Sequence, residues 1–358
     1  MIRTKIAPTA AITAALLALA ACGGSSTSSS SSAPAEASSA PAGSEAATPA
    51  ESPSAAPSPD GGGGSKLIVV NLYSQALPYF QDIAAGVTDA ANAAGFTPEV
   101  VFGQTDPALQ FTQIQNAITK APAGIIVAPI DQSSLIPVFK EGKDAGVQMV
   151  TVADNLAAEG VDQQLAYVGV EYEDIGAMKA QKIVDAIGGE GTVGVVHGIR
   201  GLHFSEAQWT GAKEVFEANP GITLVDVGYA GGFSTDLGLE KAENIFTQNP
   251  DVDAIYFDND DLALGGILAA KARGIDMDDI YIVGADGGKP ARDAAKAGEL
   301  DYSVSFCGYA TGVLATKVIV DQVVNGTGPA GPVVPVAIVE FTPDNVGELE
   351  SKVADKSC

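Results

Sequence analysis

Short polar and aromatic side chains stand directly after several apolar runs of this chain, and their types are suited to ligand chemistry. They are Tyr79, Phe80, Asp154, Asn155, Phe233, Asn259, Asp286 and Phe306. Carboxylates and amides hydrogen-bond hydroxyl groups, and an unpaired buried hydroxyl costs roughly 1–3 kcal/mol. Aromatic faces cover the C–H surface of a sugar. A strand-end cap or a core aromatic explains any one of these residues alone. The set predicts a site for a sugar or polyol.

Patterns typical of catalysis and metal binding do not emerge. His197 and His203 have no serine elbow or second metal ligand near them in the sequence, so structural or rim positions are favoured. The acidic run Asp258–Asp261 lacks the glycine and the final glutamate of a calcium loop. The glycine motif that begins at Gly189 precedes a strand, whereas a dinucleotide fingerprint must follow one. We therefore expect no catalytic residues, no cofactor and no metal.

The scaffold that must position these residues alternates apolar runs with helical stretches. Apolar runs typical of buried parallel strands are Leu67–Val70, Glu99–Phe102, Gly124–Ala128, Gln148–Val152, Thr192–Val196, Thr223–Val227, Ala254–Phe257 and Tyr281–Val283. Helical stretches are Tyr79–Ala94, Pro107–Ile118, Leu135–Ala145, Asp174–Ile187, Ser205–Ala218, Asp236–Thr247 and Leu262–Ala272. Regular alternation predicts an α/β fold with doubly wound parallel sheets. Ligands of such sheets bind outside the carboxyl ends of the strands, where the polar and aromatic residues stand.

Length and charge narrow the class of protein further. The stretch from Lys66 to the last residue is too long for one core and suits two domains of about 150 residues each. The formal net charge is −25, from 44 acidic and 19 basic residues. Such a surface repels phosphate backbones and anionic lipid headgroups. We therefore expect no nucleic-acid partner and no electrostatic attachment to membranes.

Several short blocks, in order and spacing, resemble the ribose-binding branch of the periplasmic binding protein type I family. They are Leu77–Phe80 followed by Gly86, Gly124–Asp131, Asn249–Ile255, Asn259–Gly266 and Val283–Gly287. The resemblance covers residues 66–340. It implies two αβα domains joined by three crossovers, with the ligand between them. The crossovers should lie near Val170–Glu171, Phe306–Cys307 and Pro335–Val336. The N-terminal lobe would then comprise residues 66–170 and 307–335, and the C-terminal lobe residues 171–306 and 336–358.

The resemblance also implies roles for the strand-end residues. Tyr79 and Phe80 would cover one face of the ligand, and Phe233 of the other domain the opposite face. Three polar residues would bind hydroxyls: Asp154, Asn259 and Asp286.

Three positions depart from the pattern of ribose binders. Gln208 stands where they commonly place an arginine, and Phe306 where they place a glutamine. Asp154-Asn155 replaces the usual Asp-Arg pair. These departures remove charged donors and add apolar surface. They predict a less polar pentose, a sugar alcohol or a non-sugar ligand.

The first residues have the pattern of an export signal. Met1–Lys5 is positively charged, and the apolar run Ile12–Leu19 is shorter than the ~20 residues of a membrane span. Leu19-Ala20-Ala21-Cys22 resembles a bacterial lipobox, which implies a signal peptide over residues 1–21 and a lipid on Cys22. An ordinary secretory cleavage site is the alternative. Residues 22–65, rich in Ser, Ala, Pro and Gly, predict a disordered tether. The protein is expected at the outer face of the cytoplasmic membrane.

Two further cysteines, Cys307 and Cys358, follow the signal. In an exported protein a remaining pair often forms a disulfide. One buried thiol and one terminal thiol is the alternative.

These observations leave three function classes. The first is a solute-binding lipoprotein of an ABC importer, which captures a monosaccharide or sugar alcohol of pentose or pentitol size by clamp closure. Its partners would be the ligand, the transporter permease and, through the lipid alone, the membrane; we expect a monomer. The second is a sensing receptor component for a non-sugar such as a nucleoside or signalling molecule. The third, an exported enzyme, has no nucleophile–base pair to support it. The signal and the lack of an N-terminal helix-turn-helix exclude the lactose-repressor relatives of this fold.

Overall fold

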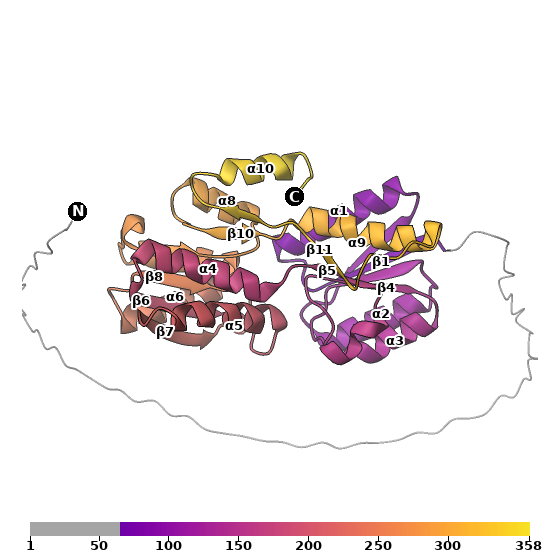
Figure 1. Cartoon of the computed structure of the whole chain (residues 1–358), viewed down its shortest axis with the longest axis horizontal. Helices are drawn as coiled ribbons and strands as arrows, with labels where there is room; N and C mark the ends of the chain where they lie inside the picture. The colour runs from indigo at the N-terminus through magenta and orange to yellow at the C-terminus, as the bar shows by residue number, and fades with distance from the viewer. Residues whose placement is uncertain (1–64) are drawn as a thin grey trace, which may run out of the picture. The chain divides into compact units, whose positions relative to one another are not determined.

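Strands and helices alternate along residues 65–358, which a computed structural model describes (Figure 1). These residues fall within one compact unit. The expected signal peptide, Cys22 and the tether through Gly64 lie outside the described residues. The α/β alternation and the parallel sheets predicted from the sequence are confirmed.

The first sheet has six parallel strands in the order β11-β5-β4-β3-β1-β2. The strands are β1 (Leu67–Leu72), β2 (Thr97–Phe102), β3 (Gly124–Val127), β4 (Gln148–Val152), β5 (Ala166–Gly169) and β11 (Val333–Pro335). Its helices are α1 (Pro78–Ala93), α2 (Pro107–Ile118), α3 (Ile136–Asp144) and α9 (Gly308–Val320). Alternate residues of β3 pack on opposite faces: Ile126 joins the core that contains Ile319 of α9, and Ile125 the core that contains Ile114 of α2. The sheet is therefore covered on both faces.

The second sheet has four parallel strands in the order β7-β6-β8-β9. The strands are β6 (Glu190–His197), β7 (Gly221–Tyr229), β8 (Ala254–Phe257) and β9 (Tyr281–Val283). Its helices are α4 (Tyr172–Ile187), α5 (His203–Glu217), α6 (Thr235–Gln248), α7 (Asp260–Ala272) and α8 (Lys289–Lys296). The short strand β10 (Ser303–Ser305) pairs antiparallel with β12 (Val339–Phe341), and α10 (Val346–Ala354) follows. A parallel bridge between Asp286 and Ser305 links β10 to the sheet.

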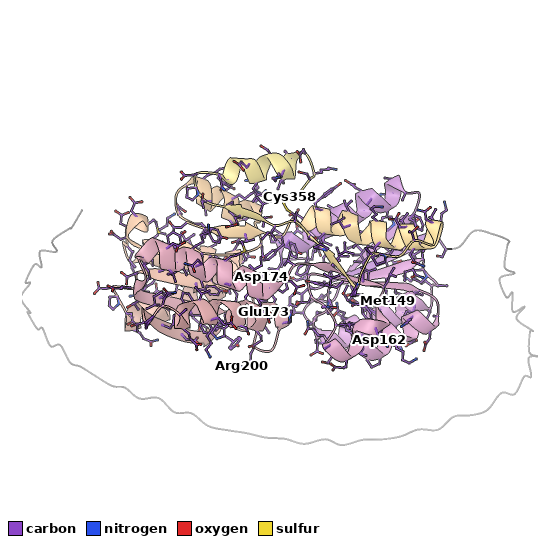
Figure 2. The ribbon with its side chains drawn as sticks, in the orientation of Figure 1. Met149, Asp162, Glu173, Asp174, Arg200 and Cys358 are labelled. Atoms are coloured by element: carbon purple, nitrogen blue, oxygen red, sulfur yellow. A yellow bond between two sulfur atoms is a disulfide. The ribbon has the colours of Figure 1, made fainter. Side chains whose placement is uncertain are left out.

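Three connections join the two sheets. The first leads from β5 to α4. The first turn of α4 carries Glu173 and Asp174 (Figure 2), whose negative charges interact favourably with the positive end of the helix dipole. The second leads from β10 to α9, which packs on β4 and β5. The third leads from β11 to β12. We propose, on this arrangement, an N-terminal lobe of residues 66–170 and 307–335 and a C-terminal lobe of residues 171–306 and 336–358.

Glycines allow neighbouring helices to approach each other at backbone distance. A Cβ atom at Gly176 of α4 would overlap the carbonyl oxygen of Gln208 in α5, and one at Gly211 of α5 would overlap that of Glu173 in α4. The same reciprocal contact joins two further helix pairs, α1 with α9 through Gly86 and Gly312, and α6 with α7 through Gly238 and Gly265. The backbones of α4 and α5 therefore lie in close contact, and so do the side chains that these two helices contribute between them.

Candidate functional site

A cavity opens at the carboxyl ends of the strands of both sheets. Six of the residues expected from the sequence line it: Tyr79, Phe80, Asp154, Phe233, Asn259 and Asp286. Sequence reasoning missed eight others: Tyr73, Leu77, Ala128, Pro129, Ala153, Tyr172, Leu202 and Phe204. The strand-end rule thus brings together residues more than 200 positions apart. The missed residues are mostly apolar, and nothing in their local pattern separates them from core residues.

Gln208 does not line the cavity. Its side chain is fully buried, and its Oε1 atom accepts a hydrogen bond from Lys179 Nζ at 2.8 Å. Its Nε2 atom donates to the carbonyl oxygen of Phe204 at 3.1 Å. Both ends of the Gln208 amide are thus used beneath the cavity wall, and a contact of Gln208 with the ligand stays a prediction.

Asn155 and Phe306 also lie outside the cavity lining. The Asn155 Oδ1 atom accepts hydrogen bonds from Gln164 Nε2 at 2.7 Å and from the backbone nitrogen of Leu156 at 2.9 Å. Phe306 is 1% exposed, and its ring stands edge-on to the rings of Tyr79 and Tyr172, both of which line the cavity. Phe306 thus supports the wall from behind. Asn155 organises the loop after β4.

Two carboxylates and one amide supply the polar groups of the cavity that were expected from the sequence. Asp154 Oδ1 lies 3.1 Å from His203 Nδ1, and the His203 side chain is 42% exposed at the rim. Burial raises the pKa of Asp154, and the bond to His203 opposes this shift. The same bond raises the pKa of His203. Asn259 Nδ2 donates to Asp286 Oδ2 at 3.1 Å, and Asn259 Oδ1 accepts from Leu262 nitrogen, capping α7.

Two residues that line the cavity have strained backbone conformations. Ala153 has φ 64° and Asp286 has φ 121°, values that residues with a side chain seldom adopt. The hydroxyl groups of Tyr167 and Tyr172 both donate to the carbonyl oxygen of Ala153, at 3.0 and 2.5 Å. These bonds hold the peptide that presents Asp154 to the cavity.

Aromatic rings from the segments that follow strands of both sheets form the walls. Phe80 stacks on Tyr73 with ring centroids 5.6 Å apart and planes at 19°. Phe204 stands edge-on to Phe233 at 5.5 Å. Trp209, in contrast, packs beside His197 at 4.9 Å and does not line the cavity. The walls offer the flat apolar faces that a sugar or polyol needs for its C–H surface.

Lys179 is the residue behind the site that sequence reasoning missed. It is fully buried, and its Nζ atom donates to the carbonyl oxygens of Phe257 at 2.7 Å and Asp258 at 3.0 Å, as well as to Gln208. Burial lowers the pKa of Lys179 to about 8. Its bonds fix the end of β8 immediately before Asn259. A signal existed, because Lys179 stands four residues from both Ile175 and Ile183 on the buried face of α4.

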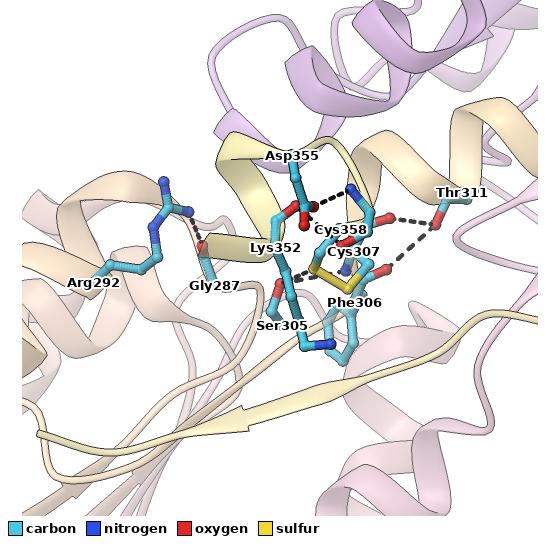
Figure 3. The surroundings of a disulfide bond; sticks show 10 residues. Gly287, Arg292, Ser305, Phe306, Cys307, Thr311, Lys352, Asp355 and Cys358 are labelled. Atoms are coloured by element: carbon cyan, nitrogen blue, oxygen red, sulfur yellow. Dashed lines mark hydrogen bonds between the residues drawn. A yellow bond between two sulfur atoms is a disulfide. The ribbon is translucent and has the colours of Figure 1, made fainter. Parts of the chain in front are cut away.

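Cys307 and Cys358, the pair put forward from the sequence, are joined by a disulfide beside Ser305 and Thr311 (Figure 3). The bond ties the last residue of the chain to the start of α9. Two residues before Cys358, Lys356 Nζ pairs with Asp89 Oδ2 of α1 at 2.6 Å. The chain end is thus attached close to the connection between β10 and α9.

Residues 65–358 contain no cluster of three or more His, Cys, Asp or Glu side chains that could hold a metal ion. Over the same range, no helix has the length and apolar character needed to cross a membrane.

Comparison with known proteins identifies relatives of this chain. A sequence model described as a periplasmic binding protein domain matches residues 68–327. A ribose import binding protein of Bacillus subtilis is 26% identical over 270 residues, which are 75% of this chain and 85% of that protein. The structure of a periplasmic ribose ABC transporter protein from Conexibacter woesei is similar, with TM-score 0.73, 36% identity and coverage of 83% and 99% of the two chains. A solute binding protein from Bacillus halodurans with bound myo-inositol gives TM-score 0.75, 29% identity and coverage of 82% and 100%.

Proposed function

The chain belongs to the periplasmic binding protein domain family, and from this premise we propose that it is the extracytoplasmic solute-binding protein of an ABC importer. The proposed ligand is a monosaccharide or sugar alcohol of pentose or pentitol size. Members of this kind bind a solute without transforming it, and we propose the same here.

One observation carries the proposal: a single cavity receives side chains from both sheets at the carboxyl ends of their strands. Asp154 follows β4 of the first sheet, and Asn259 and Asp286 follow β8 and β9 of the second. A ligand that contacts both sets gains affinity only when the lobes are together. It therefore favours the closed arrangement by its differential affinity for that state.

The ligand class rests on relatives and on the cavity together. The similar proteins are named for ribose or hold myo-inositol. The cavity of this chain combines aromatic walls with two carboxylates and one amide, and no lysine or arginine is among the described residues that line it. This composition supports a sugar alcohol, a cyclitol or a less polar pentose more than ribose itself.

The remaining features of the proposal come from the sequence. A lipid on Cys22 would hold the protein at the outer face of the cytoplasmic membrane, and residues 23–65 would give the lobes reach. The transporter permease would be the protein partner of a monomeric lipoprotein.

A thermal-shift screen of pentoses, hexoses, polyols, cyclitols and nucleosides tests the proposal, because a solute that binds the folded state raises the melting temperature. Asn259→Ala and Asp154→Ala should each weaken binding of the best solute by roughly ten- to a hundredfold in calorimetry. Asn325→Ala, at an exposed position outside the cavity, is the matched control. Binding of the solute within twofold of the parent by both cavity variants, or stabilisation by nucleosides alone, would contradict the proposal.

A further inference from the structure

The charges around the cavity do not balance. Asp154 and Asp286 both line it, whereas none of the described residues that line it is a lysine or an arginine. His203 contacts Asp154 from the rim, so it offers a partner to one carboxylate alone. Two buried cations lie outside the lining: Lys179 is directed at backbone carbonyls and at Gln208, and Arg292 Nη1 donates to the carbonyl oxygen of Gly287. Asp286 thus faces the cavity without a cationic partner.

The two carboxylates of the cavity also lack a full set of hydrogen-bond donors. Asn259 Nδ2 is committed to Asp286 Oδ2, and Asn259 Oδ1 to the cap of α7. His203 uses Asp154 Oδ1. One oxygen of each carboxylate remains without a partner among the described residues. A ligand with hydrogen-bond donors would therefore complement the cavity. Positively charged donors form the strongest hydrogen bonds with a carboxylate.

The walls favour positive charge as well. Aromatic rings from both lobes surround the polar groups: Tyr73, Tyr79, Phe80, Tyr172, Phe204 and Phe233. The face of an aromatic ring attracts a cation within about 6 Å, and the attraction is strongest where water is excluded. A carboxylate set among aromatic faces is a combination that selects an ammonium group over a hydroxyl group.

The electrostatics of Asp286 agree with this geometry. Burial and the neighbouring carboxylates of Asp260 and Asp261 raise its pKa, against the opposing effects of Asn259 and Lys179. Keeping Asp286 ionised in the cavity is therefore unfavourable until a cation arrives. A ligand that brings the cation gains an interaction that a neutral sugar lacks.

We propose that the ligand is a small polyhydroxylated amine, such as an amino sugar, an amino polyol or an amino cyclitol, whose ammonium group pairs with Asp286 among the aromatic rings. This inference rests on the proposed function and names the substrate class of the same cavity. Hydroxyl groups of such a ligand face Asp154 and Asn259. The neutral alternative, a polyol bound to a protonated Asp286, leaves the aromatic walls without a cation.

Matched ligand pairs test the proposal on the mature protein by calorimetry and thermal shift at pH 7. The pairs are glucosamine with glucose, galactosamine with galactose, glucamine with sorbitol, and an inosamine with myo-inositol. N-acetylglucosamine serves as a masked amine without the charge. The amine of the best pair should bind at least about tenfold tighter than its neutral partner, since an ion pair and a cation–aromatic contact are gained together.

Two variants separate a local ion pair from long-range attraction by an acidic protein. In Asp286→Asn the ratio of amine to neutral affinity should fall to within about threefold of one. Asp236→Asn removes one negative charge at an exposed position of α6 and should leave the ratio unchanged.

The outcomes are distinguishable. If neutral members bind as tightly as their amines, or if Asp286→Asn keeps the amine preference, the inference is overturned while the proposed function stands. If no member of any pair binds, the inference falls, whereas the proposed function falls only if the pentoses and pentitols of the wider thermal-shift screen also fail to bind. An amine preference that is lost in Asp286→Asn alone supports both.

Discussion

Replacing Lys179 by methionine removes a fully buried ammonium group and keeps an unbranched side chain of similar length. Three acceptors lose their donor: the carbonyl oxygens of Phe257 and Asp258, and Gln208 Oε1. Hydrogen bonds to a charged donor contribute about 1.5–3 kcal/mol each, and the relief of a buried charge offsets part of that loss. We expect Lys179→Met to lower the free energy of unfolding at pH 7 by about 2 kcal/mol.

The pH dependence gives the sharper test. The pKa of Lys179 falls from 10.5 to about 8 on folding. Between these values the unfolded chain binds more protons than the folded one, so this residue makes stability rise with pH and its contribution is lost as pH falls through 8. The full shift corresponds to about 3 kcal/mol, of which about 2 kcal/mol lies between pH 7 and 9.5.

Urea unfolding of wild type and Lys179→Met, followed by circular dichroism from pH 7 to 9.5, measures this difference. Titrating groups common to both proteins, tyrosines included, cancel when the two curves are subtracted. Lys213→Met, at a side chain 53% exposed on α5, is the control and should track the wild type. From pH 7 to 9.5 the free energy of unfolding of the wild type should rise by about 2 kcal/mol more than that of Lys179→Met. Parallel curves for these two proteins would refute the assignment of Lys179 as a buried cation.

Four further outcomes are expected. Phe233→Ala should weaken the best solute by about ten- to a hundredfold in calorimetry, because the ring forms part of the cavity wall. Gly176→Ala should lower the free energy of unfolding by at least about 2 kcal/mol in urea titrations, because its Cβ overlaps the backbone of α5. Cys22→Ala should release the protein from membrane fractions or leave a precursor; unchanged retention would count against lipidation. Labelling of denatured, unreduced protein should find no free thiol at Cys307 or Cys358, and two labelled thiols would contradict the bond.

The sequence predicts strands well where a run is buried on both faces. Ala254–Phe257 and Tyr281–Val283 form strands with the expected bounds. Asp106 caps α2 through Ala108 and Leu109 nitrogens, as a capping carboxylate before a first-turn proline should. Ala166–Gly169 was missed; this strand of four residues pairs with the preceding strand β4 and with β11, which lies far along the chain.

The site shows the same division. Residues that follow strands could be predicted, because the strand end places them at one edge of a sheet. Whether a side chain reaches the cavity or is buried behind its wall could not be predicted. The resemblance predicts a ligand contact for Gln208, yet its amide accepts a hydrogen bond from Lys179 of α4. This hydrogen bond depends on the close approach of α4 and α5 that Gly176 and Gly211 allow. The sequence pattern does not give the distance between the two helices.

Trp209 is the single tryptophan of the chain, and it lies in α5 against His197, Phe216 and Tyr256. The same helix carries Phe204, which lines the cavity one turn earlier. Excitation at wavelengths that tyrosine does not absorb therefore yields emission from one point of the protein, behind the wall of the site. A change in that emission on adding a solute would report altered packing of Trp209 against these three residues, so the native chain contains its own optical probe of the proposed C-terminal lobe behind the site.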